Sequence, residues 1–160
     1  MFCTGDYIIY SRHGVCRIED IRPVELPGIP KERLYYVLLP VDTRANTIFI
    51  PVADERRQLR PIISEKEAKA LIRDIKQIST ADSIPDDWEK EICDCCCRDL
   101  VKVIKSIREK ERRREREGKK LPMGDKRCLK QAVRYLLDEL ATALQLEKTE
   151  VEKLLDIENG

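Results

Sequence analysis

The cysteines are the residues of this sequence with the clearest chemical potential. The chain contains seven of them, and four lie close together at Cys93, Cys95, Cys96 and Cys97. A structural zinc site usually combines two pairs of ligands that are well separated in the sequence, and only one such group is present here. Neighbouring residues of a helix also point about 100° apart. The pattern therefore favours small side chains packed at a helix–helix contact, with one or two thiols exposed, and predicts no metal and no cofactor.

A cysteine nucleophile would need a histidine beside it as a general base. The only histidine, His13, precedes Gly14 in a predicted turn and lies far from the Cys93–Cys97 cluster in the sequence. The chain also lacks a glycine-rich phosphate loop, an H-E-x-x-H motif and a pair of carboxylates in an apolar context. We therefore expect a protein that is not an enzyme and that has no small-molecule substrate.

A basic segment is the second feature with chemical potential. The whole chain balances 31 basic against 30 acidic residues, whereas Arg98 to Arg127 holds 13 lysines and arginines against 6 acidic residues. Such an excess can neutralise several phosphates, and the binding would then depend strongly on salt. Interleaved glutamates can instead form ion pairs along a helix, so a solvated helix face is the alternative interpretation.

Five short segments in the first 62 residues have the composition of β-strands. They contain β-branched and aromatic residues in runs bounded by glycine and proline, and they cover residues 6–10, 15–22, 34–39, 47–52 and 59–62. Pro51 is expected to place the fourth segment at a sheet edge or at a strand end. Five short strands are too few for a sandwich, so we predict a small, strongly bent barrel.

The chain from residue 64 onwards has the pattern of α-helices. Ser64 and Glu67 form a capping box before the first helix, and Pro122 is typical of a helix start. The segment 108–120 contains no apolar residue, so it either projects into solvent as a charged helix or frays before Gly118. Apolar residues recur at helical spacing within residues 68–75, 100–107, 129–144 and 151–155.

Two further helix starts are predicted from capping residues. Asp86 can cap the helix that carries Trp88, the only tryptophan, and Thr149 with Glu152 can form a last capping box. Trp88 either packs between helices or inserts into a DNA minor groove as a wedge. The predicted fold class is therefore α+β, with a five-stranded β-barrel in residues 1–62 and an all-α bundle of about four to five helices in residues 64–160.

The sequence carries no sign of a membrane or of export. No segment approaches the roughly 18 consecutive apolar residues of a membrane span, and residues 1–6 lack the basic start and apolar run of a secretory signal. Cysteines that are adjacent in the chain form disulfides with each other only under strain. We therefore expect a cytoplasmic protein, in a reducing compartment, with no membrane partner.

The motifs of the two halves occur in a characteristic order. The motifs of the first half are Gly5–Tyr10, His13–Val15, Leu34–Leu38, Ile48–Val52 and Arg60–Ile62. In the second half, Leu121–Arg127 precedes a leucine-rich helical segment that ends at Ala141. Together they resemble the CarD/CdnL family of bacterial transcription regulators over roughly residues 2–146. The first half is also similar to the polymerase-interacting domain of the bacterial transcription-repair coupling factor.

This resemblance implies a function as well as a fold. It implies a Tudor-like β-module that docks on the β subunit of bacterial RNA polymerase, and a helical domain that contacts promoter DNA just upstream of the −10 element. The two would stabilise the open complex without reading a sequence. An edge strand with unpaired amides suits strand addition to a partner sheet. By position, the docking surface would fall on the second to fourth strands, at Arg22, Val24, Arg33, Phe49 and Pro51.

The DNA-contacting surface implied by the resemblance lies in the basic segment. Its residues would be Trp88, Arg98, Lys102, Lys105, Arg108, Arg112, Arg113, Arg114 and Arg116. Trp88 is followed by Glu89-Lys90-Glu91-Ile92, whereas the family has a basic pair and a tyrosine there, so wedge and packing roles both stay open. Two other functions also stay open: a polymerase-binding adaptor without DNA binding, and a metal or redox sensor built on Cys93–Cys97.

Overall fold

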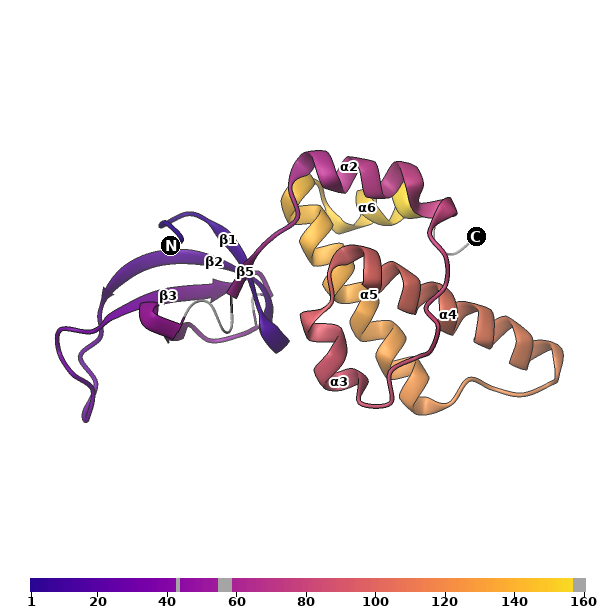
Figure 1. Ribbon diagram of the computed structural model, residues 1–160, viewed down its shortest axis with the longest axis horizontal. Helices are drawn as coiled ribbons and strands as arrows, with labels where there is room; N and C mark the ends of the chain where they lie inside the picture. The colour runs from indigo at the N-terminus through magenta and orange to yellow at the C-terminus, as the bar shows by residue number, and fades with distance from the viewer. Residues whose placement is uncertain (43, 55–58, 157–160) are drawn as a thin grey trace. The chain divides into compact units, whose positions relative to one another are not determined.

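The chain folds into two compact units, Met1–Ile62 and Ile63–Gly160 (Figure 1). The computed structural model describes residues 1–42, 44–54 and 59–156. The first unit consists of β-strands with two short 3-10 turns, and the second consists of helices. The predicted α+β class is therefore confirmed.

The first unit is a five-stranded antiparallel sheet, and each strand lies where the sequence predicts one. The strands are β1 (Tyr7–Tyr10), β2 (Gly14–Pro23), β3 (Leu34–Pro40), β4 (Ile48–Pro51) and β5 (Leu59–Pro61), in the spatial order β4-β3-β2-β1-β5. Among the described residues β4 pairs only with β3, and β5 pairs only with β1. A barrel would need β4 and β5 to pair with each other. The sheet is not closed, so the predicted Tudor-like barrel is not confirmed.

One face of the sheet carries the core of the first unit. The core side chains alternate along the strands, as expected for a sheet buried on one face, and they are Ile8, Cys16, Ile18, Tyr36, Leu38 and Ile50. A β-bulge interrupts this alternation in β2, where Ile18 lies opposite Leu38 and Asp20 lies opposite Val37. The extra residue, Glu19, shifts the alternation of β2 by one position. Side chains after the bulge therefore exchange faces, and Arg22 lies on the face away from the core.

The second unit contains five α-helices within residues 63–156. They are α2 (Glu65–Asp74), α3 (Trp88–Glu91), α4 (Cys97–Arg116), α5 (Met123–Leu144) and α6 (Lys148–Leu155), with 3-10 turns η3 (Ile75–Gln77) after α2 and η4 (Ile92–Asp94) after α3. This agrees with the predicted bundle of about four to five helices. None of the described helices is long and apolar enough to span a membrane.

The helix starts test the capping predictions one by one. The capping box of α2 is confirmed, because Ser64 Oγ accepts the N–H of Glu67 and the Glu67 carboxylate accepts the N–H of Ser64. The predicted cap at Asp86 is wrong, since the residue before α3 is Asp87 and its side chain makes no cap bond.

The capping box predicted at Thr149 and Glu152 is also wrong. The box forms two residues earlier, between Glu147 and Glu150. Thr149 already lies inside α6, whereas Glu147 has the extended backbone of a capping residue. A glutamate is an unusual N-cap, which is why its position gave no signal in the sequence.

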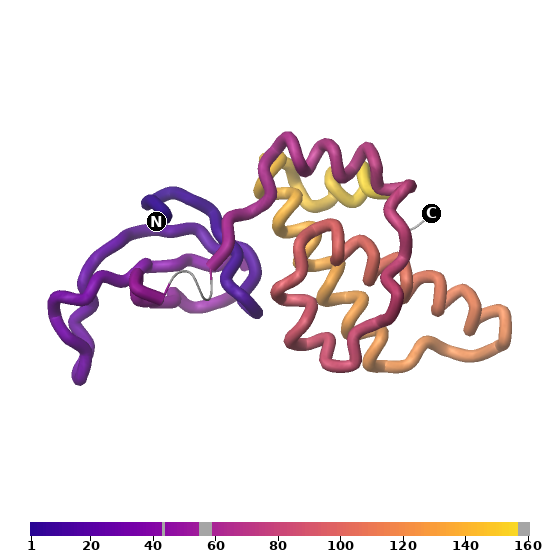
Figure 2. The backbone as a smooth tube through the Cα atoms, in the orientation of Figure 1, coloured from indigo at the N-terminus to yellow at the C-terminus, as the bar shows by residue number. Residues whose placement is uncertain are grey.

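The core of the helical unit is built mainly by α4 and α5. Leu100, Ile104 and Ile107 of α4 pack with Leu136 and Leu140 of α5, and all five are at most 1% exposed. Beyond Ile107 the helix α4 continues to Arg116 without apolar residues. The charged segment is therefore a continuous helix, and its end projects past the other helices (Figure 2). Gly118, with φ of 72°, begins the return to α5.

Candidate functional site

The face of the sheet away from the core gathers most of the predicted docking residues. Tyr35 in β3 lies opposite Arg22 in β2 on one side and opposite Pro51 in β4 on the other. Residues paired across strands share a face, so these three form one row. Val37 and Phe49 form the next row. The register therefore brings Arg22, Phe49 and Pro51 together on the outer face.

Strand β4 is an end strand of the sheet, as Pro51 predicts. Its outer edge has no strand partner among the described residues. The Phe49 side chain on this strand is 39% exposed, which is high for a large apolar residue. An unpaired backbone edge beside an exposed aromatic ring is the arrangement that accepts a strand from another sheet.

Arg33 lies next to this face just before β3. Its Nη2 is 3.3 Å from Asp54 Oδ2, and its guanidinium carbon is 5.9 Å from the centre of the Tyr35 ring. Both contacts hold the side chain near the row that contains Tyr35. Side-chain exposure of 43% leaves the guanidinium accessible to a partner.

Val24 does not share this accessibility. It follows β2 and is only 7% exposed, so its side chain offers almost no surface to a partner. Sequence reasoning missed two residues that do offer surface on the outer face. Tyr7 and Leu39 flank Arg17 in a row across β1, β2 and β3, and they are 40% and 44% exposed. The spacing of Leu39 from Val37 and Tyr35 places it on the outer face, because alternate residues of a strand share a face. Its exposure did not follow from that spacing, since Tyr35 and Val37 are only 6% and 7% exposed.

The eight cations predicted to contact DNA all lie on one helix, α4. Four of them have exposed side chains, namely Arg98, Arg112, Arg113 and Arg116, and the other four are partly buried. Lys102 pairs with Asp99 at 3.4 Å, and Arg108 pairs with Glu111 at 3.1 Å. The helix thus combines exposed cations with partly buried ones.

Three of the predicted DNA-binding cations, Lys105, Arg114 and Arg116, donate to backbone carbonyls of their own unit. Arg116 Nε lies 3.4 Å from the carbonyl oxygen of Arg112. Lys105 Nζ lies 2.5 Å from the carbonyl oxygen of Ile75 and 2.8 Å from that of Ile78. These carbonyls belong to the turn that ends α2, and partial burial lowers the pKa of Lys105. Arg114 Nε donates to the carbonyl of Lys120 at 2.8 Å. Lys105 therefore stabilises the end of α2, and Arg114 holds the loop between α4 and α5.

Trp88 is the first residue of α3. Its side chain is neither fully buried nor fully exposed, and it packs against the core of the helical unit. This packing corresponds to the first of the two roles that the sequence left open.

The clustered cysteines differ in exposure. Cys93 and Cys97 are buried, Cys95 is half-buried and Cys96 is exposed. Burial is the main reason that the pKa of Cys95 and that of Cys128 are both raised to about 11, so both are thiols and not thiolates at neutral pH. In the part of the chain that the structure describes, no three histidine, cysteine or acidic side chains are grouped to hold a metal ion.

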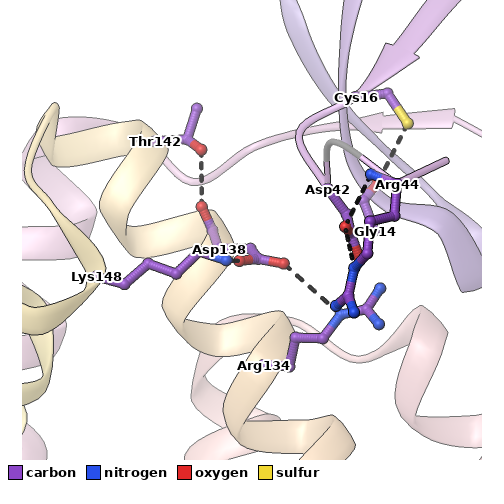
Figure 3. Close-up of polar contacts among 8 residues, drawn as sticks. All are labelled: Gly14, Cys16, Asp42, Arg44, Arg134, Asp138, Thr142 and Lys148. Atoms are coloured by element: carbon purple, nitrogen blue, oxygen red, sulfur yellow. Dashed lines mark hydrogen bonds and ion pairs between the residues drawn. The ribbon is translucent and has the colours of Figure 1, made fainter.

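Two buried carboxylates in α5 were not found from the sequence. Asp138 is 5% exposed and lies between Arg134, at 3.8 Å, and Lys148 at the start of α6 (Figure 3). Glu139 is 1% exposed, and its Oε1 accepts the N–H of Ile63 at 2.9 Å. These acids hold α6 and the first residue of the helical unit against α5. Two adjacent acids within a leucine stripe were the available signal.

Comparison with known families identifies both halves of the chain. Residues 2–63 match the CarD-like/TRCF RID domain, and residues 98–156 match the C-terminal domain of CarD. The chain belongs to the CarD-like family. The resemblance stated from the sequence is thereby confirmed. CarD-like proteins are transcription regulators that interact with RNA polymerase, and Trp88 and the clustered cysteines lie between the two matched segments.

Proposed function

We propose that this CarD-like protein docks on the β subunit of bacterial RNA polymerase through β4 and the outer face of its sheet, and that its helical unit then contacts promoter DNA and stabilises the open complex. Residues 1–62 carry the docking function and residues 64–160 carry the DNA contact. Both units belong to one chain, so docking raises the effective concentration of the second unit near DNA. Modest affinity at each surface is then sufficient.

The observation that carries this proposal is the outer edge of β4, which no strand in residues 1–42, 44–54 or 59–62 pairs with, beside the exposed Phe49 ring. Strand addition supplies backbone hydrogen bonds along the edge, and side chains on the outer face supply specificity. Arg22 and Arg33 pair with Asp20 and Asp54, at 3.3 Å each, and their exposed guanidiniums present further N–H donors next to Phe49 and Pro51. Such a surface fits a partner strand with acidic neighbours.

A double variant, Phe49→Ala with Arg33→Glu, tests the docking surface. We expect its affinity for purified RNA polymerase to fall at least about tenfold, because an aromatic anchor and a charge at the centre of an interface dominate its energy. Affinity is measured by pull-down and by surface binding. The matched control is Leu154→Ala with Lys153→Glu, which changes an exposed leucine and an exposed lysine of α6. Equal binding by both variants would move the interface away from β4.

The DNA contact in this proposal rests on the solvent face of α4. Its exposed cations are Arg98, Arg112, Arg113 and Arg116. They can bind backbone phosphates whatever the base sequence of the DNA. Lys105 supports the surface by holding the end of α2, and Arg114 supports it by holding the loop after α4. Trp88 contributes through its packing of α3 against the bundle.

The alternative is a polymerase-binding adaptor without DNA binding, which the intramolecular partners of Lys102, Lys105 and Arg108 favour. Fluorescence anisotropy with a promoter fragment separates the two functions. We expect the affinity for DNA to fall about tenfold or more between 50 and 200 mM salt. We expect Arg113→Glu to lower this affinity further. Polymerase binding without any salt-dependent DNA affinity would establish the adaptor instead.

A further inference from the structure

A groove in the helical unit collects cations from two separate elements. It has a volume of about 630 Å³. One side is formed by α4 and the other by the turn after α2, while the last residues of α6 close one end. Its lining residues are Ile75, Lys76, Thr80, Lys105, Arg108, Glu109, Arg112, Arg116, Leu155 and Asp156.

The arginines of the α4 side follow one another at regular intervals. Arg108, Arg112 and Arg116 are four residues apart, so they lie along one side of the helix with a rise of about 6 Å between neighbours. Arg112 and Arg116 are exposed. Guanidinium groups bind phosphate oxygens through paired N–H donors. Because arginine side chains are long, guanidiniums on one side of the helix can converge on the linked phosphates of one ligand.

The opposite side of the groove adds a cation and a hydroxyl. Lys76 and Thr80 are both exposed and lie on the segment that follows α2. Ile75 and Leu155 provide apolar surface between the polar groups. A ligand in the groove would thus meet positive charge from both sides and an apolar patch at the base.

The charges that line the groove are predominantly positive. The five cations, Lys76, Lys105 and the three arginines, face two acids, Glu109 and Asp156. Lys105 is occupied by two carbonyls and Arg108 by Glu111, as described above. Arg116 Nε also donates to the carbonyl of Arg112 at 3.4 Å. The lining as a whole keeps a net positive charge, which attracts an anion.

We propose that this groove binds a compact anion with two or three linked phosphates, such as a nucleotide or inorganic oligophosphate. Its volume lies within the range of about 300–1,000 Å³ that is usual for small-ligand sites. Arg98, Lys102 and Arg113 of the same helix do not line the groove, so the site is distinct from the rest of the basic face. The inference goes beyond the DNA contact proposed above, although a ligand that covers Arg112 and Arg116 would compete with DNA.

Calorimetric titration of the full chain, without DNA and without polymerase, tests the site. The probes are inorganic tripolyphosphate, ATP, AMP and adenosine. We expect saturable binding of tripolyphosphate and ATP with dissociation constants below about 1 mM, weaker binding of AMP and none of adenosine. Tighter binding of ATP than of tripolyphosphate identifies a nucleotide as the ligand source, and equal binding identifies inorganic oligophosphate.

Matched variants locate the binding. Arg112→Gln with Arg116→Gln should weaken ATP or tripolyphosphate binding at least about tenfold. Lys76→Gln, on the opposite side, should weaken it about threefold or more. Lys130→Gln removes an exposed cation of α5 outside the groove and is the control. Thermal melting of each variant shows that the fold is retained.

Three results would overturn the inference. The first is the absence of saturable oligophosphate binding up to about 1 mM. The second is an equal affinity of the Lys76→Gln and Lys130→Gln variants for tripolyphosphate or ATP. The ligand would then lie outside the groove. The third is a chain that binds duplex DNA but neither tripolyphosphate nor ATP. The proposed DNA contact can fail without affecting any of these measurements, because the titrations contain no DNA.

Discussion

Lys105 illustrates how a cation in a basic segment can serve the fold of its own unit. Its ammonium donates to the carbonyls of Ile75 and Ile78, which end α2 and the turn after it. The last carbonyls of a helix have no partner within the helix, and a lysine nearby can satisfy them. Composition alone does not separate such a lysine from one that faces a phosphate.

Replacement of this lysine should reduce stability. Lys105→Met keeps the apolar stem but removes the donor for both carbonyls, so we expect the free energy of unfolding to fall by about 1–2 kcal/mol. The control is Lys102→Met, one turn earlier, which removes only an ion pair with Asp99 at the surface and should cost less than about 1 kcal/mol. Urea denaturation measures both. An equal, small effect of the two changes would contradict the capping role of Lys105.

At the scale of elements, local chemistry predicted the five strands and the start of α2, but it misplaced the caps of α3 and α6. The five strands follow from short β-branched and aromatic runs bounded by glycine or proline, and the start of α2 follows from Ser64 and Glu67. The face that Arg22 occupies was not predictable, because the bulge at Glu19 exists only in the pairing of β2 with β3. Whether the sheet closes also depends on long-range pairing.

The candidate surfaces show the same division. Phe49 and Pro51 could be assigned to an edge strand from proline and apolar patterning. The burial of Val24 and the exposure of Leu39 depend on tertiary packing and could not be read from single residues. In α4 the order of the cations was visible in the sequence. Which of these cations caps a helix, which forms an ion pair and which lines the groove depends on the neighbouring elements, above all on the turn after α2.

At the scale of the whole molecule, two compact units on one chain allow one partner to be held while a second is contacted. The chain belongs to a family of transcription regulators. Within the described part of its first unit, the β4 edge without a strand partner is the feature best suited to a protein partner. Every other step of the proposed function depends on this contact. If the first unit does not dock, the DNA contact proposed for α4 has no tether.

Hydrogen exchange of the full chain, with and without RNA polymerase, tests that contact most directly. Pairing of β4 with a polymerase strand would give hydrogen-bond partners to its outward-facing amides. We therefore expect exchange within Ile48–Ile50 to slow at least about tenfold in the complex, while exchange in α6 stays unchanged. Polymerase binding that leaves the exchange of β4 unaltered and protects another element instead would contradict docking through this edge.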